Sequence, residues 1–285
     1  MTCLPPESVY LMESAEETFR LEMKTDPSAL RAQARWCGLR PGIRVLDAGC
    51  GPGKTTALLC NMIQPGGSIV GVDLSEERIR HAREQYGRMP GIDFRVHDWT
   101  APLEGTEAFD LIWVRFVLEY NRAGSAEMVR NLDRCLEPGG TLCLMDLDHN
   151  CLNHHELPIG MAAVLQRMMQ ELEERHNFDP YAGRKLYRYL YDLGYEDLEV
   201  KLTAHHLIYG PLGETDAFNW LKKIEMISRK VRDVLEGYPG GPDRFFSDFL
   251  RFFRDPRRFS YTPLILCKGR KPLSALLQDV MHQAH

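Results

Sequence analysis

Five short apolar runs alternate with amphipathic segments between residues 40 and 150, and this alternation constrains the fold more than any other feature. Each run is apolar on both faces, which is typical of parallel strands buried between two layers of helices. Strand and helix repeated in this way predict a doubly wound α/β sheet. The runs are residues 43–49, 68–75, 92–98, 109–116 and 141–148.

Helix signals fill the gaps between these runs. Ser75 precedes Glu76 and Glu77, which predicts an N-cap followed by acidic residues in the first turn. A second helix is predicted over residues 55–63. A third is predicted over residues 126–137, where the apolar positions share one face before Pro-Gly-Gly ends the pattern.

The pattern changes after residue 150. A long helical stretch covers residues 160–177, and a long strand is predicted over residues 197–210. The last strand is predicted over residues 261–269. About fifty residues separate these two strands, which is far longer than a usual connection. We therefore expect a seven-stranded, mostly parallel sheet with an N-terminal helical extension and a helical insertion between its last two strands.

Charge and cysteine content exclude several classes of function. The net charge is −5 and the pI is about 6.1, so the chain has no basic footprint for nucleic acid. The eight cysteines include no C-x-x-C pair, which argues against a zinc cluster or a disulfide framework. The N-terminus is acidic, and no apolar run is long enough to span a membrane. We expect a cytoplasmic protein that binds neither nucleic acid nor membrane.

The stretch LDAGCGPGKTT, residues 46–56, is compatible with three nucleotide-binding loops. A phosphate loop of an NTPase would need glycine at Ala48, and Asp47 would bring a carboxylate close to a polyanion. A dinucleotide loop needs different spacing of its third glycine, Gly53. S-adenosylmethionine carries a sulfonium and an ammonium but no phosphate, so an acid before the loop becomes favourable. The glycines then let the backbone approach that ligand closely.

Acids end three successive predicted strands. Asp47 ends the first, Asp73 the second and Asp98 the third. A carboxylate at the second strand end can accept hydrogen bonds from both ribose hydroxyls, as in other sheets that bind a nucleoside at this edge. Asp98 can accept from the adenine amino group. Three acids in this order indicate an S-adenosylmethionine site more strongly than any glycine motif alone.

The motifs VLDAGCGPG, GVDLS, VHDW, FDLIWVRFVLEY and LEPGGTLCLMDLD occur in this order. Together they resemble a class I S-adenosylmethionine-dependent methyltransferase over about residues 40–150. Within that superfamily the chain is most similar to the small-molecule branch that includes the ubiquinone and menaquinone biosynthesis methyltransferases, which GRKLYRYLYDLGYEDLEV also resembles. The resemblance implies a small-molecule methyl acceptor, and we expect a monomer or a homodimer.

The resemblance also implies a set of cofactor-binding residues. The glycine loop and Arg115 would hold the methionine part, the second strand end the ribose, and the third strand end the adenine. Tyr10 and Arg20 belong to an N-terminal segment that resembles a helix closing over the cofactor in relatives. The implied residues are Asp47, Gly49, Cys50, Gly51, Gly53, Thr55, Asp73, Leu74, Asp98, Trp99, Arg115, Tyr10 and Arg20.

Methyl transfer is an in-line displacement, so alignment and exclusion of water matter most and a general base is optional. Asp146, His149 and His154 are candidates for such a base, because they follow the fifth strand at the edge where ligands of these sheets bind. The alternative is a polar loop over the sheet edge. No metal site is expected, since nothing in the sequence indicates ligands that converge in space.

Four segments describe the expected organisation. Residues 1–40 form an N-terminal helical cap, and residues 41–210 form the S-adenosylmethionine-binding core. Residues 211–260 form a helical insertion that serves as lid and acceptor lobe, and residues 261–285 hold the last strand and a tail. The second helix of the insertion contains five phenylalanines, which we interpret as distributed around the helix, so that some are left to line an acceptor pocket.

Two other functions remain open. A protein with the same motifs can bind the cofactor without turnover. A methyltransferase that acts on a macromolecule would need a basic groove, and the first helix of the insertion offers five cations, although their helical spacing equally fits a solvated face. Those cations are Lys222, Lys223, Arg229, Lys230 and Arg232.

Overall fold

A mixed sheet forms the centre of the computed structural model, which describes residues 26–102 and 108–273. Among these residues the sheet has eight strands, in the order β3-β2-β1-β4-β5-β8-β6, with β7 also paired to β8. The first five strands are parallel, and β8 runs antiparallel to β5, β6 and β7. The strands are β1 (Arg44–Ala48), β2 (Ser68–Asp73), β3 (Ile92–Val96), β4 (Phe109–Arg115), β5 (Leu136–Leu147), β6 (His154–His155), β7 (Glu196–Ile208) and β8 (Phe259–Arg270).

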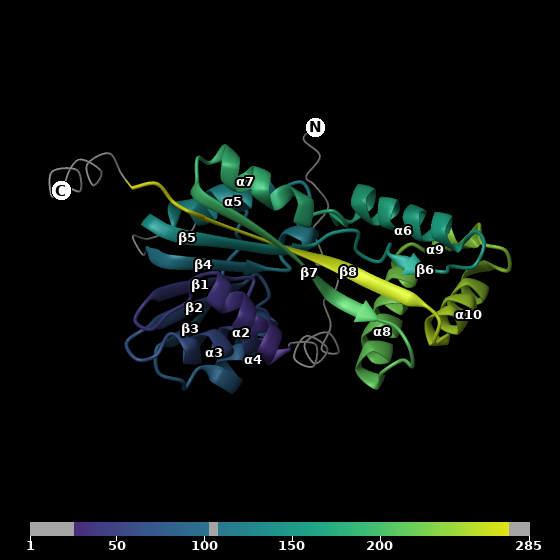
Figure 1. The fold of residues 1–285 in the computed structure, drawn as a ribbon, viewed down its shortest axis with the longest axis horizontal. Coiled ribbons are helices and arrows are strands. Elements are labelled where there is room, and N and C mark those ends of the chain that lie inside the picture. Colours follow the sequence, from purple (N-terminus) through teal and green to yellow (C-terminus); the bar gives the residue numbers. More distant parts are fainter. Residues whose placement is uncertain (1–25, 103–107, 274–285) are drawn as a thin grey trace.

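Helices cover both faces of this sheet and form a separate group at one end of the molecule (Figure 1). Two short 3₁₀ helices, η1 (Leu118–Tyr120) and η2 (Gly183–Lys185), lie in connections. The α-helices of the described residues are α2 (Pro27–Trp36), α3 (Lys54–Met62), α4 (Glu76–Tyr86), α5 (Ser125–Arg134), α6 (Met161–Arg175), α7 (Leu186–Asp192), α8 (Glu214–Lys230), α9 (Arg232–Glu236) and α10 (Gly241–Arg254). Each is too short or too polar to span a bilayer.

Alternate residues of each central strand enter two different cores. Val45 and Trp113 pack with residues of α2 and α3 on one face. Leu46 and Ile112 pack with residues of α5 and α7 on the other. This arrangement explains why the five runs are apolar on both faces, and it confirms the predicted doubly wound, mostly parallel fold. The short β6 adds an eighth strand to the seven that were predicted.

A local signal sets the start of α4, whereas tertiary pairing sets the end of α5. Ser75 caps α4 as predicted, since its hydroxyl accepts from the Arg78 N–H at 3.4 Å. The prediction of a helix over residues 126–137 was too long, because α5 ends at Arg134. Leu136 already pairs with Phe109 in the sheet. Tertiary pairing therefore overrides the helical pattern at this point.

The insertion between β7 and β8 forms α8, α9 and α10, which Figure 1 shows at the right of the view with α6. These four helices share one apolar core that includes Met168, Trp220 and Phe249. We call this group the helical lobe. The insertion therefore packs on a helix that precedes β7 in the sequence. The four predicted segment boundaries stay a prediction.

The interpretation of the phenylalanines of α10 was wrong. Phe245, Phe249, Phe252 and Phe253 are each at most 7% exposed and belong to the core of the helical lobe. Phe246 is partly buried against the same core. At 100° per residue these five positions span about one third of the helix circumference. They share one face, and none is left over to line a separate pocket.

We expect Phe249→Ala to lower the free energy of unfolding by about 3–5 kcal/mol, because a fully buried aromatic ring leaves a cavity. Phe246→Ala, three residues earlier in α10, serves as the matched control. Since Phe246 is only partly buried, its loss should cost about 1–2 kcal/mol. Denaturant unfolding followed by circular dichroism measures both. Equal losses would contradict this packing.

Candidate functional site

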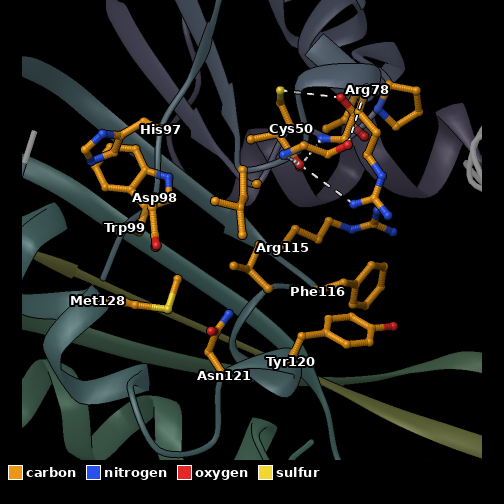
Figure 2. A pocket seen from close by; sticks show the side chains of 18 of the residues that line it. Cys50, Arg78, His97, Asp98, Trp99, Arg115, Phe116, Tyr120, Asn121 and Met128 are labelled. Atoms are coloured by element: carbon orange, nitrogen blue, oxygen red, sulfur yellow. Dashed lines mark hydrogen bonds and ion pairs between the residues drawn. The ribbon is translucent and has the colours of Figure 1, made fainter. Parts of the chain in front are cut away.

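A pocket of about 390 Å³ lies at the carboxyl ends of the parallel strands. Segments that follow β1, β2, β3 and β4 line it, so one sheet edge brings together residues far apart in sequence (Figure 2). No lining residue comes from residues 211–260. The lining residues that the sequence analysis named are Gly49, Cys50, Gly51, Thr55, Asp73, Leu74, Asp98, Trp99 and Arg115.

The loop after β1 needs its glycines. Gly49 has a φ of 81°, and a Cβ there would lie 2.2 Å from the Cγ2 atom of Val117. Gly53 has a φ of 91°, and a Cβ there would lie 2.8 Å from the Cβ of Ala82. Side chains are strained in this left-handed region and would also collide with neighbours. The loop therefore stays thin enough to leave room for a ligand above it, although Gly53 itself lies outside the pocket lining.

Asp73 ends β2 and organises the loop opposite. Its Oδ2 atom accepts from the Gly51 N–H at 2.9 Å, and its Oδ1 atom accepts from the Ser75 N–H at 3.0 Å. Arg78 lies 3.7 Å from Oδ1. A carboxylate has about four lone-pair sites, so these two backbone bonds leave acceptor capacity on both oxygens. That capacity suits the two hydroxyls of a ribose.

Asp47 lies beneath the loop and outside the pocket lining. It is 2% exposed, and its Oδ2 atom accepts from the Thr56 hydroxyl at 2.7 Å. Burial raises the pKa of Asp47 to about 7, although the hydrogen bond from Thr56 and the charge of Arg115 act in the opposite direction. This carboxyl thus supports the loop from below and contributes to the electrostatic field at the floor of the pocket.

Arg115 ends β4 and brings a cation to the pocket. Burial lowers its pKa to about 10, against the charges of Asp47 and Asp146, so the guanidinium remains protonated at neutral pH. Its Cζ atom lies 4.1 Å from the centre of the Phe116 ring. Its buried Nε has no hydrogen-bond partner among the described residues. A charged donor of this kind suits a carboxylate.

Aromatic and acidic side chains gather at the other side of the pocket, where Figure 2 shows His97, Asp98 and Trp99 together. Trp99 is 4% exposed and packs in the core below the pocket, with its carbonyl accepting from Asn131 at 3.0 Å. The rings of His97 and Trp99 meet edge to face at 4.8 Å. Asp98 is exposed, and its Oδ1 atom accepts from the Thr100 N–H at 2.9 Å.

Cys50 is a buried member of the loop. Burial raises the pKa of its thiol well above the ordinary value, and the charges of Asp47 and Asp73 act in the same direction. The thiol is therefore neutral and unreactive. Tyr10 and Arg20, the other two residues that the resemblance implied, lie outside the described residues.

The three candidates for a general base do not line the pocket. Asp146 is fully buried, and burial together with Glu119 raises its pKa well above the ordinary value. The ring of His149 lies against Tyr181 at 5.2 Å. Among the described residues, no group of three or more His, Cys, Asp or Glu side chains is arranged to hold a metal ion.

His154 lies inside the helical lobe. Its ring meets the rings of Trp220, Phe249 and Phe252 at 5.1–5.9 Å, and its Nδ1 atom lies 2.8 Å from the Ser260 hydroxyl. Burial lowers its pKa to about 4. A neutral imidazole among aromatic rings is a packing element rather than a group facing the pocket.

Several lining residues escaped the sequence analysis. Phe116, Tyr120 and Asn121 follow β4, and Met128 comes from α5. The rule that named Asp73, that a residue just past a parallel strand reaches the ligand edge, also applies to Phe116. Tyr120 and Asn121 depend on the turn of η1, which the sequence pattern does not predict.

Comparisons with known proteins agree with this geometry. Residues 45–140 match the family described as methyltransferase domain. Phosphoethanolamine N-methyltransferase 2 of Haemonchus contortus, solved in complex with S-adenosyl-L-methionine, superposes with a TM-score of 0.58 at 16% identity, over 94% of this chain and 61% of that one. The chain thus shares its fold with a methyltransferase that was solved with S-adenosyl-L-methionine bound, and its residues 45–140 match a methyltransferase domain.

Two curated relatives match part of the chain. A trans-aconitate 2-methyltransferase of Acidovorax sp. (strain JS42) is 35% identical over 119 residues, which cover 42% of this chain and 44% of the relative. An uncharacterized 37.1 kDa protein in transposon TN4556 of Streptomyces fradiae is 29% identical over 157 residues, which cover 55% of this chain and 44% of the relative. The chain therefore matches less than half the length of these relatives.

The raised pKa of Asp47 predicts how stability depends on pH. The folded chain keeps a proton between about pH 4 and about pH 7 that the unfolded chain releases, so the free energy of unfolding falls as pH rises through that window. Asp47→Asn has no such proton. From about pH 5 to about pH 8 we expect the natural chain to lose up to about 3 kcal/mol more than the variant. Urea unfolding at both pH values measures this, and equal losses would refute it.

Proposed function

We propose that this chain transfers the methyl group of S-adenosylmethionine to a small-molecule acceptor. The observation that carries the proposal is the pairing of Asp73 with the glycine loop: a carboxylate with spare acceptor capacity faces a thin loop at the edge of a doubly wound sheet. Phosphate groups would meet Asp73 there, with Asp47 beneath the loop, so a cofactor with a sulfonium and an ammonium fits better than a nucleotide polyphosphate.

The two sides of the pocket suggest how the cofactor lies. Asp98 and Trp99 would hold the adenine, with Asp73 and Leu74 at the ribose. Arg115, whose buried Nε has no partner among the described residues, would take the carboxylate of the methionine part. The reactive end would then lie toward Phe116, Tyr120 and Asn121. When bound, S-adenosylmethionine supplies an electrophilic methyl group on its sulfonium.

The chain's own contribution would be alignment and exclusion of water. Phe116 and Tyr120 present rings at this end of the pocket, and apolar walls lower the local dielectric around the reacting atoms. In-line displacement needs the acceptor atom held behind the methyl group, and correct orientation accounts for much of the rate. An acceptor with a nucleophile of low pKa would need no general base.

The acceptor would be either a flat aromatic ring or a small polycarboxylic acid. The sequence resembles enzymes of quinone biosynthesis, and the aromatic wall would suit a flat ring of that kind. One of the two curated relatives is a trans-aconitate 2-methyltransferase, and Arg78 and Arg115 in the pocket give an acid some electrostatic support. A turnover assay with a phenolic quinone precursor and with small polycarboxylic acids distinguishes the two classes.

A cofactor-binding protein without turnover is the second candidate. It is favoured by one observation, that Asp146, His149 and His154 all lie away from the lining of the pocket. Binding of S-adenosylmethionine with no product from any acceptor would support it. A macromolecular acceptor is less well supported, because Lys222 and Arg229 on α8 pair with Glu225, and paired charges are typical of a solvated face.

We expect Asp73→Ala to weaken binding of S-adenosylmethionine and S-adenosylhomocysteine alike, because both carry the ribose. The loss of two hydrogen bonds to a carboxylate should cost about 2–4 kcal/mol, which is about thirty- to a thousand-fold in dissociation constant. Calorimetric titration measures both ligands. Asp93→Ala is the control, since this acid pairs with Arg95 on the exposed side of β3. Unchanged affinity in folded Asp73→Ala would remove the basis of the proposal.

A further inference from the structure

A buried acid supports the segment that ends the pocket. Glu119 lies in the middle of η1, is 3% exposed, and precedes the lining residues Tyr120 and Asn121. Its N–H donates to Asp146 Oδ2 at 3.1 Å, and its carbonyl accepts from the Asp179 N–H at 2.7 Å. The backbone of Glu119 is thus held on both sides, and its carboxylate must be accommodated in the interior.

Asn150 connects this carboxylate to the helical lobe. The side chain is 1% exposed, and its Nδ2 atom donates to Glu119 Oε2 at 2.7 Å. Its Oδ1 atom accepts from Lys223 Nζ at 2.6 Å. An ammonium has donors only, so the amide orientation is fixed with its oxygen toward Lys223. The Asn150 amide therefore links a cation on α8, Lys223, to an acid beside the pocket, Glu119, through two hydrogen bonds.

Lys223 belongs to the lobe rather than to the sheet. Its ammonium lies 5.4 Å from the centre of the Trp220 ring, and it forms no ion pair within 4 Å among the described residues. Lys222, the preceding residue, instead pairs with Glu225 at 3.6 Å on the same helix. The two neighbouring lysines therefore have different surroundings, which makes one a matched control for the other.

The wall of the pocket and the core of the lobe also meet at Tyr120. This residue lines the pocket and packs against the lobe core, with its ring 5.7 Å from that of Phe178. Any change in the placement of Glu119 would therefore move a residue that contacts both. Loss of Lys223 would leave the buried Oδ1 atom of Asn150 without its charged donor, which is costly. The amide would then shift, and its hydrogen bond to Glu119 would weaken.

We propose that Lys223 and Asn150 are positioning residues. They hold Glu119, and through it Tyr120 and Asn121, at the methionine end of the pocket. The lobe would thereby contribute to cofactor binding without touching the cofactor. This inference rests on the proposed function, because it assigns that end of the pocket to the amino-acid part of S-adenosylmethionine.

Comparing the affinities of two ligands distinguishes an effect at the methionine end of the pocket from an effect at the adenosine end. S-adenosylhomocysteine has the amino-acid part, whereas 5′-methylthioadenosine lacks it and keeps the adenosine. We expect Lys223→Met to raise the dissociation constant of S-adenosylhomocysteine about tenfold and to leave that of methylthioadenosine within about twofold. Lys222→Met should change neither, and Lys223→Arg, which keeps the cation and its donors, should restore at least part of the affinity. Calorimetric titration measures each value after circular dichroism confirms folding.

A double-mutant cycle tests the link itself. Glu119→Gln should weaken S-adenosylhomocysteine binding about tenfold, and Glu119→Gln combined with Lys223→Met should also weaken it about tenfold, rather than about a hundredfold as for independent sites. If Glu119→Gln does not fold, the contrast among Lys223→Met, Lys223→Arg and Lys222→Met decides the question alone.

The outcomes remain distinguishable from a failure of the proposed function. If the natural chain binds neither ligand, the proposed function fails. If it binds both, any one of three results overturns the positioning role. The first is an unchanged affinity for S-adenosylhomocysteine in folded Lys223→Met, and the second is an equal rise in the dissociation constants of both ligands. The third is a rise of about a hundredfold in the double variant, as for independent sites.

Discussion

The hydrogen bond from the Gly51 N–H to Asp73 Oδ2 joins the loop after β1 to the end of β2, and the pocket depends on it. The bond requires backbone geometry that only a glycine-rich loop adopts at low cost. It also requires parallel strands, because only then do the carboxyl ends of β1 and β2 meet at one edge. The site therefore depends on the fold, because a change of register between these strands would separate Gly51 from Asp73.

Two buried charged residues, Asp47 and Arg115, lie at the floor of the pocket, and burial shifts the pKa of each. Asp47 lies under the loop with its pKa raised to about 7, whereas Arg115 stays protonated beside it. Ionisation of Asp47 would stabilise the guanidinium, and a bound cationic ligand would favour the same ionised state. The ionisation of Asp47 at the floor of the pocket is thus coupled to the charge of the ligand, although Asp47 does not line the pocket.

The sequence predicted what depends on periodicity and on strand ends. Asp73 was identified as the acid that ends the second predicted strand, and Ser75 as a cap because two acids follow it. The face of α10 was predictable too, but its five phenylalanines were wrongly spread around the helix. The contacts of Asn150 were not predictable, since they join residues 31 and 73 positions apart. No local pattern encodes which side chains meet across two cores.

The helical lobe has its own apolar core, yet it is tied to the sheet by polar groups and by Tyr120. Apolar packing alone is tolerant of small shifts, because side chains of similar volume substitute for one another. A buried chain of hydrogen bonds is less tolerant, since each member must keep its partner. In the proposed positioning role, the contacts of Lys223, Asn150 and Glu119 hold the lobe relative to the pocket more sharply than its core does.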